Sequence, residues 1–361
     1  MRGRKERQAE MLLGVTPDEL VPANHPIRAI RLLVDAVLAE LSPQFDAMYE
    51  RIGRPSVPPE HLLKASILMA LYSLRSERQF CERLQYDILF KWFLDLNISE
   101  PAFDATTFTK NRERLLDHDI ARAFFGEVVR EAQRRRLLSE DHFSVDGTLL
   151  QAWASIKSYR PRDEQTPPPG GGRNPDVDFH GERRSRETHV SRTDPGALLF
   201  KKAASEAARL CYMGHALIEN RHGLVVDVQL TQATGGAERE AAITMLDRMK
   251  GRQGGITLGA DKGYDTYGFH DQLAARDVVA HVAWNDGSKR RPIPEALEGD
   301  PAYQTSQRRR KLVEEVFGWM KTVGTGRKLR YVGLRRNELW ATLTAAVYNL
   351  VRMAKIEALA T

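Results

Sequence analysis

The sequence predicts an all-helical N-terminal domain followed by an α/β domain with a mixed sheet. Through the first 137 residues, apolar side chains recur mostly with the 3.6-residue period of amphipathic helices. From Phe143 the period shortens to two, and strands then alternate with helices, which is typical of an α/β layer. We therefore place the two domains at 1–137 and 138–361, with a disordered insertion at 157–197.

Composition and charge favour a soluble protein that binds a polyanion. The chain has 361 residues and a net charge of +6. Its cations gather at 2–7, 134–136, 183–186, 289–291, 308–311 and 327–336. Cys81 and Cys211 lie far apart without metal-ligand spacing, which argues for a reducing compartment and against structural zinc. Because no signal peptide and no uninterrupted apolar span is visible, we expect a cytoplasmic protein without a membrane partner.

Short helices are predicted throughout the N-terminal domain. Their expected positions are 26–41, 59–74, after Ser76, 87–94, after Asp104 or Thr106, and 119–137. The helix after Thr106 is cationic, and its Lys110 and Arg112 are candidate DNA contacts. Such a run of helices is compatible with a helix-turn-helix DNA reader and equally with a plain helical bundle.

The α/β domain opens with a strand at 143–153 that carries Asp146 in its interior. Aspartate is disfavoured inside a strand, so Asp146 either forms a bend or serves chemistry. The proline-rich segment 161–195 has few apolar residues and is predicted to be a disordered or loosely ordered insertion. The elements expected next are a hairpin of 215–218 and 224–230, a helix at 234–250, a strand at 256–261 ending in Asp261, a helix to 275, a strand at 278–282, a loop at 286–303 and a C-terminal helix from 337.

One amphipathic helix is predicted from Arg308 to Lys321. On a helical wheel, Arg310, Glu314 and Lys321 lie within roughly 40° of one another, bordering the apolar side, whereas Glu315 points elsewhere. This arrangement is compatible with a solvated ion-pair row. It is also compatible with a metal-binding acid between two phosphate-binding cations, although this stretch on its own favours the ion-pair row.

Three carboxylates on these elements predict a divalent-metal site. If the strands of Asp146 and Asp261 are neighbours and the helix of Glu314 packs across them, the three acids converge. Their mutual repulsion would be costly unless a cation bound them, and an all-oxygen ligand set suits Mg²⁺ or Mn²⁺. Two such ions, about 3.5–4 Å apart, would activate an attacking oxygen and stabilise a leaving oxygen at a phosphodiester. Arg310 and Lys321 would then hold neighbouring phosphates.

Three motifs together resemble the signatures of bacterial insertion-sequence DDE transposases. They are Ser144-Val145-Asp146-Gly147-Thr148, Ala260-Asp261-Lys262-Gly263-Tyr264-Asp265 and Arg310-x3-Glu314-x6-Lys321. The chain is most similar to the IS-four/IS-five superfamily and, within it, to the IS-five branch, where Val precedes the Glu as Val313 does here. That family's third motif begins with Tyr, and this chain has Gln307 in its place. The resemblance covers most of the chain outside 161–195.

The resemblance implies an RNase H-like fold with acids on its first and fourth strands and on a late helix. It implies catalytic and metal-binding roles for Asp146, Asp261 and Glu314, with two Mg²⁺ or Mn²⁺ ions as cofactors. Tyr264 is expected to pack at the strand end and is also a candidate DNA contact. Trp153 and Trp319 are expected to be core aromatics.

The resemblance also implies a function, namely metal-dependent cleavage at insertion-sequence ends followed by transfer of the 3′-hydroxyl strand into target DNA. The expected partners are double-stranded DNA, as terminal inverted repeats and target, and a second copy of the chain in the DNA complex. No nucleotide cofactor is expected, and the protein would associate with the nucleoid when bound to DNA. Two alternatives stay open: a non-transposing nuclease of the same fold, and a DNA-binding regulator or decayed copy.

Overall fold

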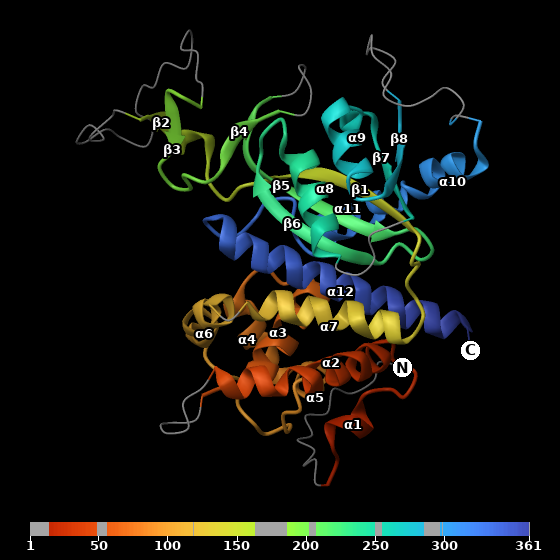
Figure 1. Ribbon diagram of the computed structural model, residues 1–361. Helices are drawn as coiled ribbons and strands as arrows, with labels where there is room; N and C mark the ends of the chain where they lie inside the picture. The colour runs from red at the N-terminus through yellow and green to blue at the C-terminus, as the bar shows by residue number, and fades with distance from the viewer. Residues whose placement is uncertain are drawn as a thin grey trace, which may run out of the picture.

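The computed structural model describes residues 14–48, 56–117, 119–162, 186–201, 207–249, 255–284, 297 and 299–360. A helical layer lies below a mixed sheet, and helices cover both faces of that sheet (Figure 1). The long helix α12 (Leu334–Ala360) lies between the helical layer and the sheet and contacts both. None of the helices in these ranges is long and apolar enough to cross a membrane.

The N-terminal part is helical, as the sequence predicts. Its helices are α1 (Pro17–Leu20), α2 (Ile27–Ala47), α3 (Pro59–Leu71), α4 (Glu77–Tyr86), α5 (Ile88–Phe93), α6 (Thr106–Asp117) and α7 (Ile120–Arg134). Ser76 and Asp87 start α4 and α5 by accepting hydrogen bonds from the N–H groups of Gln79 and Phe90. The chain changes from helix to strand between Arg134 and His142.

The apolar core of the helical layer continues through α12 to one face of the sheet. A single cluster of buried side chains includes Leu33 of α2, Phe124 of α7, Leu350 of α12, Val316 of α11 and Ala216 of β5. The N-terminal helices and the sheet therefore share one hydrophobic core, with α12 in its middle.

The main sheet has the strand order β6-β5-β1-β7-β8, with the short β4 paired to the start of β5. Its strands are β1 (His142–Gln151), β4 (Leu198–Phe200), β5 (Arg209–Glu219), β6 (Val225–Gln232), β7 (Ile256–Ala260) and β8 (Val278–Val282). β5 runs antiparallel to β1 and β6, whereas β7 is parallel to both β1 and β8. Along β1, β5, β6, β7 and β8, Asp146 lies on the first strand and Asp261 directly follows the fourth. The predicted RNase H-like arrangement is therefore confirmed.

Five helices enclose the sheet. α8 (Ala237–Arg248) and α9 (Tyr267–Ala274) cover one face, and α10 (Pro301–Arg309), α11 (Leu312–Thr322) and α12 cover the other. The prediction of one helix over 308–321 is wrong, because the chain makes a turn at Arg310 and Lys311 between α10 and α11. Both residues keep helical torsion angles, which explains why the sequence shows no break.

Two buried polar side chains fix the β5–β6 hairpin. The carboxylate of Glu219 is fully buried and accepts four backbone N–H groups, from Ser139, Arg221, His222 and Leu224. The amide of Asn349 in α12 both donates to and accepts from the backbone of Val225, each at 2.8 Å. These bonds tie α12 to the hairpin and satisfy backbone groups that burial would otherwise leave unpaired.

The segment predicted as a disordered insertion is ordered at both described ends. The 3₁₀ turn η1 (Ile156–Ser158) leads into β2 (Tyr159–Pro161), which pairs antiparallel with β3 (His189–Ser191). Tyr159 and His189 are buried and stack with their ring centroids 5.4 Å apart. Residues 163–185 of the predicted insertion lie outside the described ranges.

Candidate active site

Asp146 on β1 and Asp261, which directly follows β7, lie at the same level of two adjacent strands. β1 and β7 are parallel, and their last paired residues are Ser144 and Gly259. Two further residues along each strand lead to the two acids, and neighbouring strands lie about 4.8 Å apart. A Cβ on Gly259 would meet Ser144 and the carbonyl oxygen of Ser306 in α10, which shows which side this alternate set faces. Both acids therefore lie on the face that α10 and α11 cross.

Backbone N–H groups just downstream orient the two carboxylates. Oδ1 of Asp146 accepts the N–H of Gly147 at 2.7 Å, and Oδ1 of Asp261 accepts the N–H of Gly263 at 2.8 Å. Glycine suits the second position, because a Cβ there would lie 3.0 Å from the same Oδ1 atom. The sequence singled out both acids without revealing these bonds.

Tyr264 is fully buried beneath the two acids, so the prediction that it contacts DNA is wrong. Its ring packs against Phe269 with the centroids 5.3 Å apart. Burial raises the pKa of its hydroxyl well above the ordinary value. Three neighbouring carboxylates raise that pKa further, those of Glu238, Asp146 and Asp261.

Glu238 is an acid near the site that sequence reasoning missed. It lies in the first turn of α8, and a Cβ on Gly147 would be 2.7 Å from its Oε1 atom. Gly147 therefore lets this carboxylate approach the backbone of β1 beside Asp146. The glycine within a predicted strand was the available signal, since such a residue often marks a close approach.

Glu314 lies in the first turn of α11 with its side chain exposed. α11 packs on β1 and β5 through a buried apolar stripe that includes Val313 and Val316. Glu315 instead faces α12, where its Oε2 atom lies 3.5 Å from the guanidinium of Arg352. The structure thus separates two adjacent acids that composition alone cannot distinguish.

A cationic residue lies near each end of α11, Arg310 before it and Lys321 in its last turn. Lys321 donates from Nζ to Oγ1 of Thr148 on β1 at 2.5 Å, two residues beyond Asp146. Arg310 ends α10 and is not part of α11, so the wheel that grouped it with Glu314 is wrong in that detail. The Nε atom of Arg310 is buried, and no partner for it is found in the described chain.

Gln307 occupies the position where the resembling family has Tyr. Its amide donates to the carbonyl oxygens of Ala260, at 3.5 Å, and of His281. Ala260 immediately precedes Asp261, so Gln307 ties α10 to the end of the strand that carries the second acid.

The carboxylate oxygens of the candidate site suit a hard divalent cation, although the described acids do not converge on a single point. Among the described residues, no group of three His, Cys, Asp and Glu side chains is placed to hold a metal ion. The strand-borne pair, Asp146 and Asp261, supplies carboxylate oxygens from a rigid sheet, and such ligands fit Mg²⁺ or Mn²⁺.

The two predicted DNA contacts on α6 have different environments. Lys110 is exposed. Arg112 forms an ion pair with Glu77, and these side chains are only 13% and 20% exposed. The prediction that Arg112 contacts DNA is therefore wrong, because its guanidinium belongs to an internal network.

Two family models match the chain. The first, described as a transposase domain (DUF772), matches residues 15–114. The second, described as a transposase DDE domain, matches residues 187–350, which include Asp261 and Glu314. Together they cover well over half of the chain. It belongs to the DDE transposases of insertion-sequence type. Asp146 lies between the two matched segments.

The solved structures that align with the chain share little sequence identity with it. The piggyBac transposase synaptic complex with hairpin DNA aligns with a TM-score of 0.42 and 9% identity, over 96% of this chain and 78% of that one. The Mos1 transposase paired-end complex aligns with a TM-score of 0.21 and 12% identity, over 78% of this chain and 83% of that one. No curated protein sequence matches the chain.

Proposed function

We propose that Asp146, Asp261 and Glu314 are the catalytic and metal-binding residues of this transposase. The observation that carries the proposal is the placement of the first two at one level on adjacent parallel strands, beneath the helices that bring the third. Glu314 lies in the first turn of α11, directly after the turn at Arg310 and Lys311, so a movement at that turn would bring its carboxylate to the strand ends. Divalent cations bound by Asp146 and Asp261 would supply the attraction for that movement.

The proposed reaction is phosphodiester cleavage at the element ends followed by strand transfer. Water attacks the phosphorus, and the 3′-oxygen leaves and takes up a proton. The released 3′-hydroxyl then attacks a target phosphodiester and displaces the 3′-oxygen of the target strand, which takes up the proton that the attacking hydroxyl loses. When bound, two Mg²⁺ or Mn²⁺ ions supply activation of the attacking oxygen and charge stabilisation of the leaving oxygen. Asp146 and Asp261 hold fixed positions for this chemistry because backbone N–H groups orient them.

Arg310 and Lys321 are the proposed phosphate contacts beside the acids. The buried Nε atom of Arg310 lacks a protein partner among described residues, so a phosphate oxygen would satisfy it. Lys321 already reaches β1 through Thr148, which places its ammonium beside the strand of the first acid. Gln307 would act indirectly, because its amide fixes the end of β7 before Asp261.

The wider assembly follows from the reaction. Two element ends must be held together, so we propose a homodimer on DNA. We assign DNA contacts to the helical domain, residues 1–137, with Lys110 among them, and catalysis to residues 138–361. We place the chain in the IS-five branch, and in the cytoplasm at the nucleoid.

The test is a supercoiled plasmid carrying the matching inverted repeats, incubated with the protein and Mg²⁺. Cleavage and joining should both be lost in Asp146→Asn, Asp261→Asn and Glu314→Gln. Glu315→Gln is the matched control, because Glu315 faces Arg352, and it should retain most of the activity. Undiminished cleavage in any of the first three variants would overturn the site assignment. Cleavage without joining by the wild type would indicate a nuclease.

A further inference from the structure

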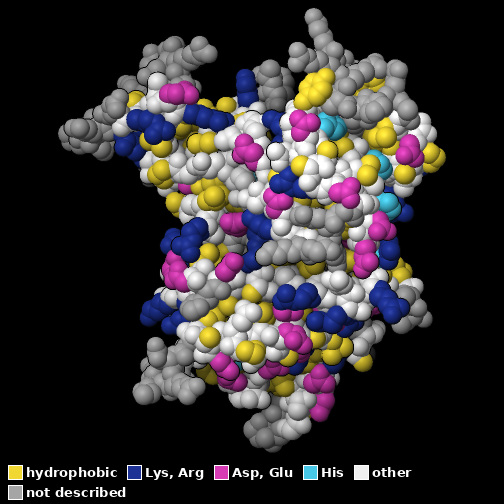
Figure 2. Space-filling view, in the orientation of Figure 1, with side chains coloured by type: hydrophobic (Ala, Val, Ile, Leu, Met, Phe, Trp, Pro, Cys, Tyr) yellow, Lys and Arg dark blue, Asp and Glu magenta, His cyan; other side chains and the backbone are white. Residues whose placement is uncertain are grey.

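A basic connector, residues 323–333, joins α11 to α12 and runs between the sheet and the helical layer. Its backbone lies beside the end of β1, because Leu329 donates its N–H to the carbonyl oxygen of Gln151 at 2.7 Å and Lys328 forms a parallel bridge with Gln151. Over the described part of the face in Figure 2, Lys and Arg side chains are interspersed with acids. The distribution of charge over this face therefore does not by itself locate a binding surface, whereas the hollows beside the connector do.

An open hollow of ≈ 640 Å³ lies on the sheet side of the connector. It begins at Lys321, whose ammonium bonds Thr148 close to the active site. Its remaining charged lining residues are all cations: Lys201, Arg209 and Arg327. A wall with this single sign of charge is suited to a phosphate backbone.

A second hollow, of ≈ 580 Å³, lies on the helical side of the connector. Arg75, Arg78 and Arg330 line it, together with Trp153. The acid in its wall, Glu77, is already paired with Arg112. The two hollows lie on either side of the same short connector. Their cations therefore form a row along the surface from Lys321 to the helical layer.

Trp153 is half-exposed, at 50%, and the expectation that it is a core aromatic is wrong. Its neighbours Ala152 and Ala154 are buried, and the N–H of Ala152 bonds the carbonyl oxygen of Leu210 at 2.9 Å. The indole is thus held outward by an anchored backbone. Lys328 lies over its ring, with Nζ 5.2 Å from the centroid. An exposed aromatic plane beside cations is the combination that binds a nucleobase and its phosphates.

We propose that the surface formed by Lys321, Arg327, Lys328 and Trp153 binds single-stranded DNA leading away from the active site, with a base stacked on Trp153. The inference rests on the proposed function, which supplies DNA strands with freed ends at Asp146. Trp153 lies seven residues further along the chain, roughly 20 Å for an extended strand. A duplex keeps its bases stacked on one another, so its backbone could use the cations but its bases could not reach the indole.

The experiment measures fluorescence anisotropy of a labelled oligodeoxythymidylate and of a labelled duplex of equal length. Full-length protein is used in EDTA, so that no cleavage occurs. Trp153→Ala should weaken binding of the single strand about tenfold, while Trp153→Phe should retain most of it. The duplex should be affected much less. Tyr86→Ala is the matched control, because Tyr86 is an exposed aromatic at the other end of α4 from Glu77, which contacts Tyr331 of the connector, and it does not line either hollow.

The salt dependence supplies a second measurement. Arg327→Ala should reduce the slope of log affinity against log salt by about 0.7 for the single strand, whereas Lys355→Ala, an exposed cation on α12, should not. Single-strand binding by Trp153→Ala equal to the wild type, or an equal loss in Tyr86→Ala, would overturn the inference. Plasmid cleavage by the wild type, measured in parallel, separates that failure from a failure of the proposed function.

Discussion

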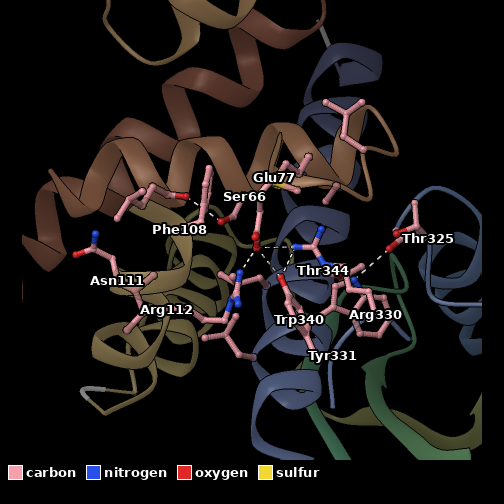
Figure 3. A pocket seen from close by; sticks show the side chains of 18 residues that line it. Ser66, Glu77, Phe108, Asn111, Arg112, Thr325, Arg330, Tyr331, Trp340 and Thr344 are labelled. Atoms are coloured by element: carbon pink, nitrogen blue, oxygen red, sulfur yellow. Dashed lines mark hydrogen bonds and ion pairs between the residues drawn. The ribbon is translucent and has the colours of Figure 1, made fainter. Parts of the chain in front are cut away.

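Arg112 forms an ion pair with Glu77, and its guanidinium lies over the ring of Tyr331, 4.6 Å from the ring centroid. Tyr331 also donates a hydrogen bond from its hydroxyl to Glu77 at 3.2 Å. Figure 3 shows these side chains together at a cavity between the helical layer and α12. Arg112, which the sequence suggested as a DNA contact, therefore joins α6 to the connector before α12.

Replacing Arg112 should destabilise the protein. Arg112→Ala leaves Glu77 poorly paired in a mostly buried position, so we expect a loss of about 2–3 kcal/mol in the free energy of unfolding. Lys110→Ala is the control on the same helix, and its exposed side chain predicts a change below about 0.5 kcal/mol. Urea unfolding measures both. Equal stability of the two variants would contradict the network described for Arg112.

Two glycines in one region should respond oppositely to alanine. A Cβ on Gly326 would lie 2.3 Å from the Trp340 ring and 2.9 Å from the carbonyl oxygen of Met320, so Gly326→Ala should cost about 2 kcal/mol or more. Gly318 lies within α11, and a Cβ there meets nothing within 4 Å. Gly318→Ala should therefore stabilise the protein by about 0.5–1 kcal/mol. Thermal unfolding of the pair checks both signs.

Acid should destabilise the protein through His215. Burial lowers the pKa of this imidazole from 6.5 to about 4. Between these two pH values His215 binds a proton in the unfolded chain and not in the folded one. The free energy of unfolding therefore falls as pH drops from about 6.5 towards 4. The full effect is about 3 kcal/mol.

The pH effect can be isolated by substitution. His215→Gln should flatten the dependence of unfolding free energy on pH in that range, relative to the wild type. Parallel pH curves for the wild type and the His215 variant would refute the assignment.

Removing the side-chain amide of Asn349 should lower the free energy of unfolding strongly. Asn349→Leu removes the partners of both the N–H and the carbonyl of Val225, which are buried, so we expect a loss of about 2–4 kcal/mol. Lys355→Ala, exposed on the same helix, should be near neutral. Unfolding in urea distinguishes the two, and a mild effect of Asn349→Leu would show that water replaces the amide.

The strands and helices near the acids were predictable because their periodicity is strong. β8 has the predicted bounds, and α3 begins at the predicted Pro59. The adjacency of β1 and β7 does not follow from the sequence, because strand pairing is a long-range property that no local pattern encodes.

The errors also have physical causes. Trp153 follows a strand pattern, yet its outward direction depends on which face the neighbouring alanines bury. Tyr264 and Arg112 are polar residues that suit a surface by type, and only tertiary contacts place them inside. The turn at Arg310 has helical torsion angles and therefore leaves no trace in composition.

The central position of α12 has a consequence for synthesis of the chain. The N-terminal helices emerge first, but the helix that completes their core is made after all of them. Until Leu334–Ala360 has been translated, the apolar sides of α2, α3 and α7 lack the surface against which they pack. The N-terminal helices therefore become stable only once α12 has been made, so a fragment of the chain that ends before Leu334 should not form a stable helical layer.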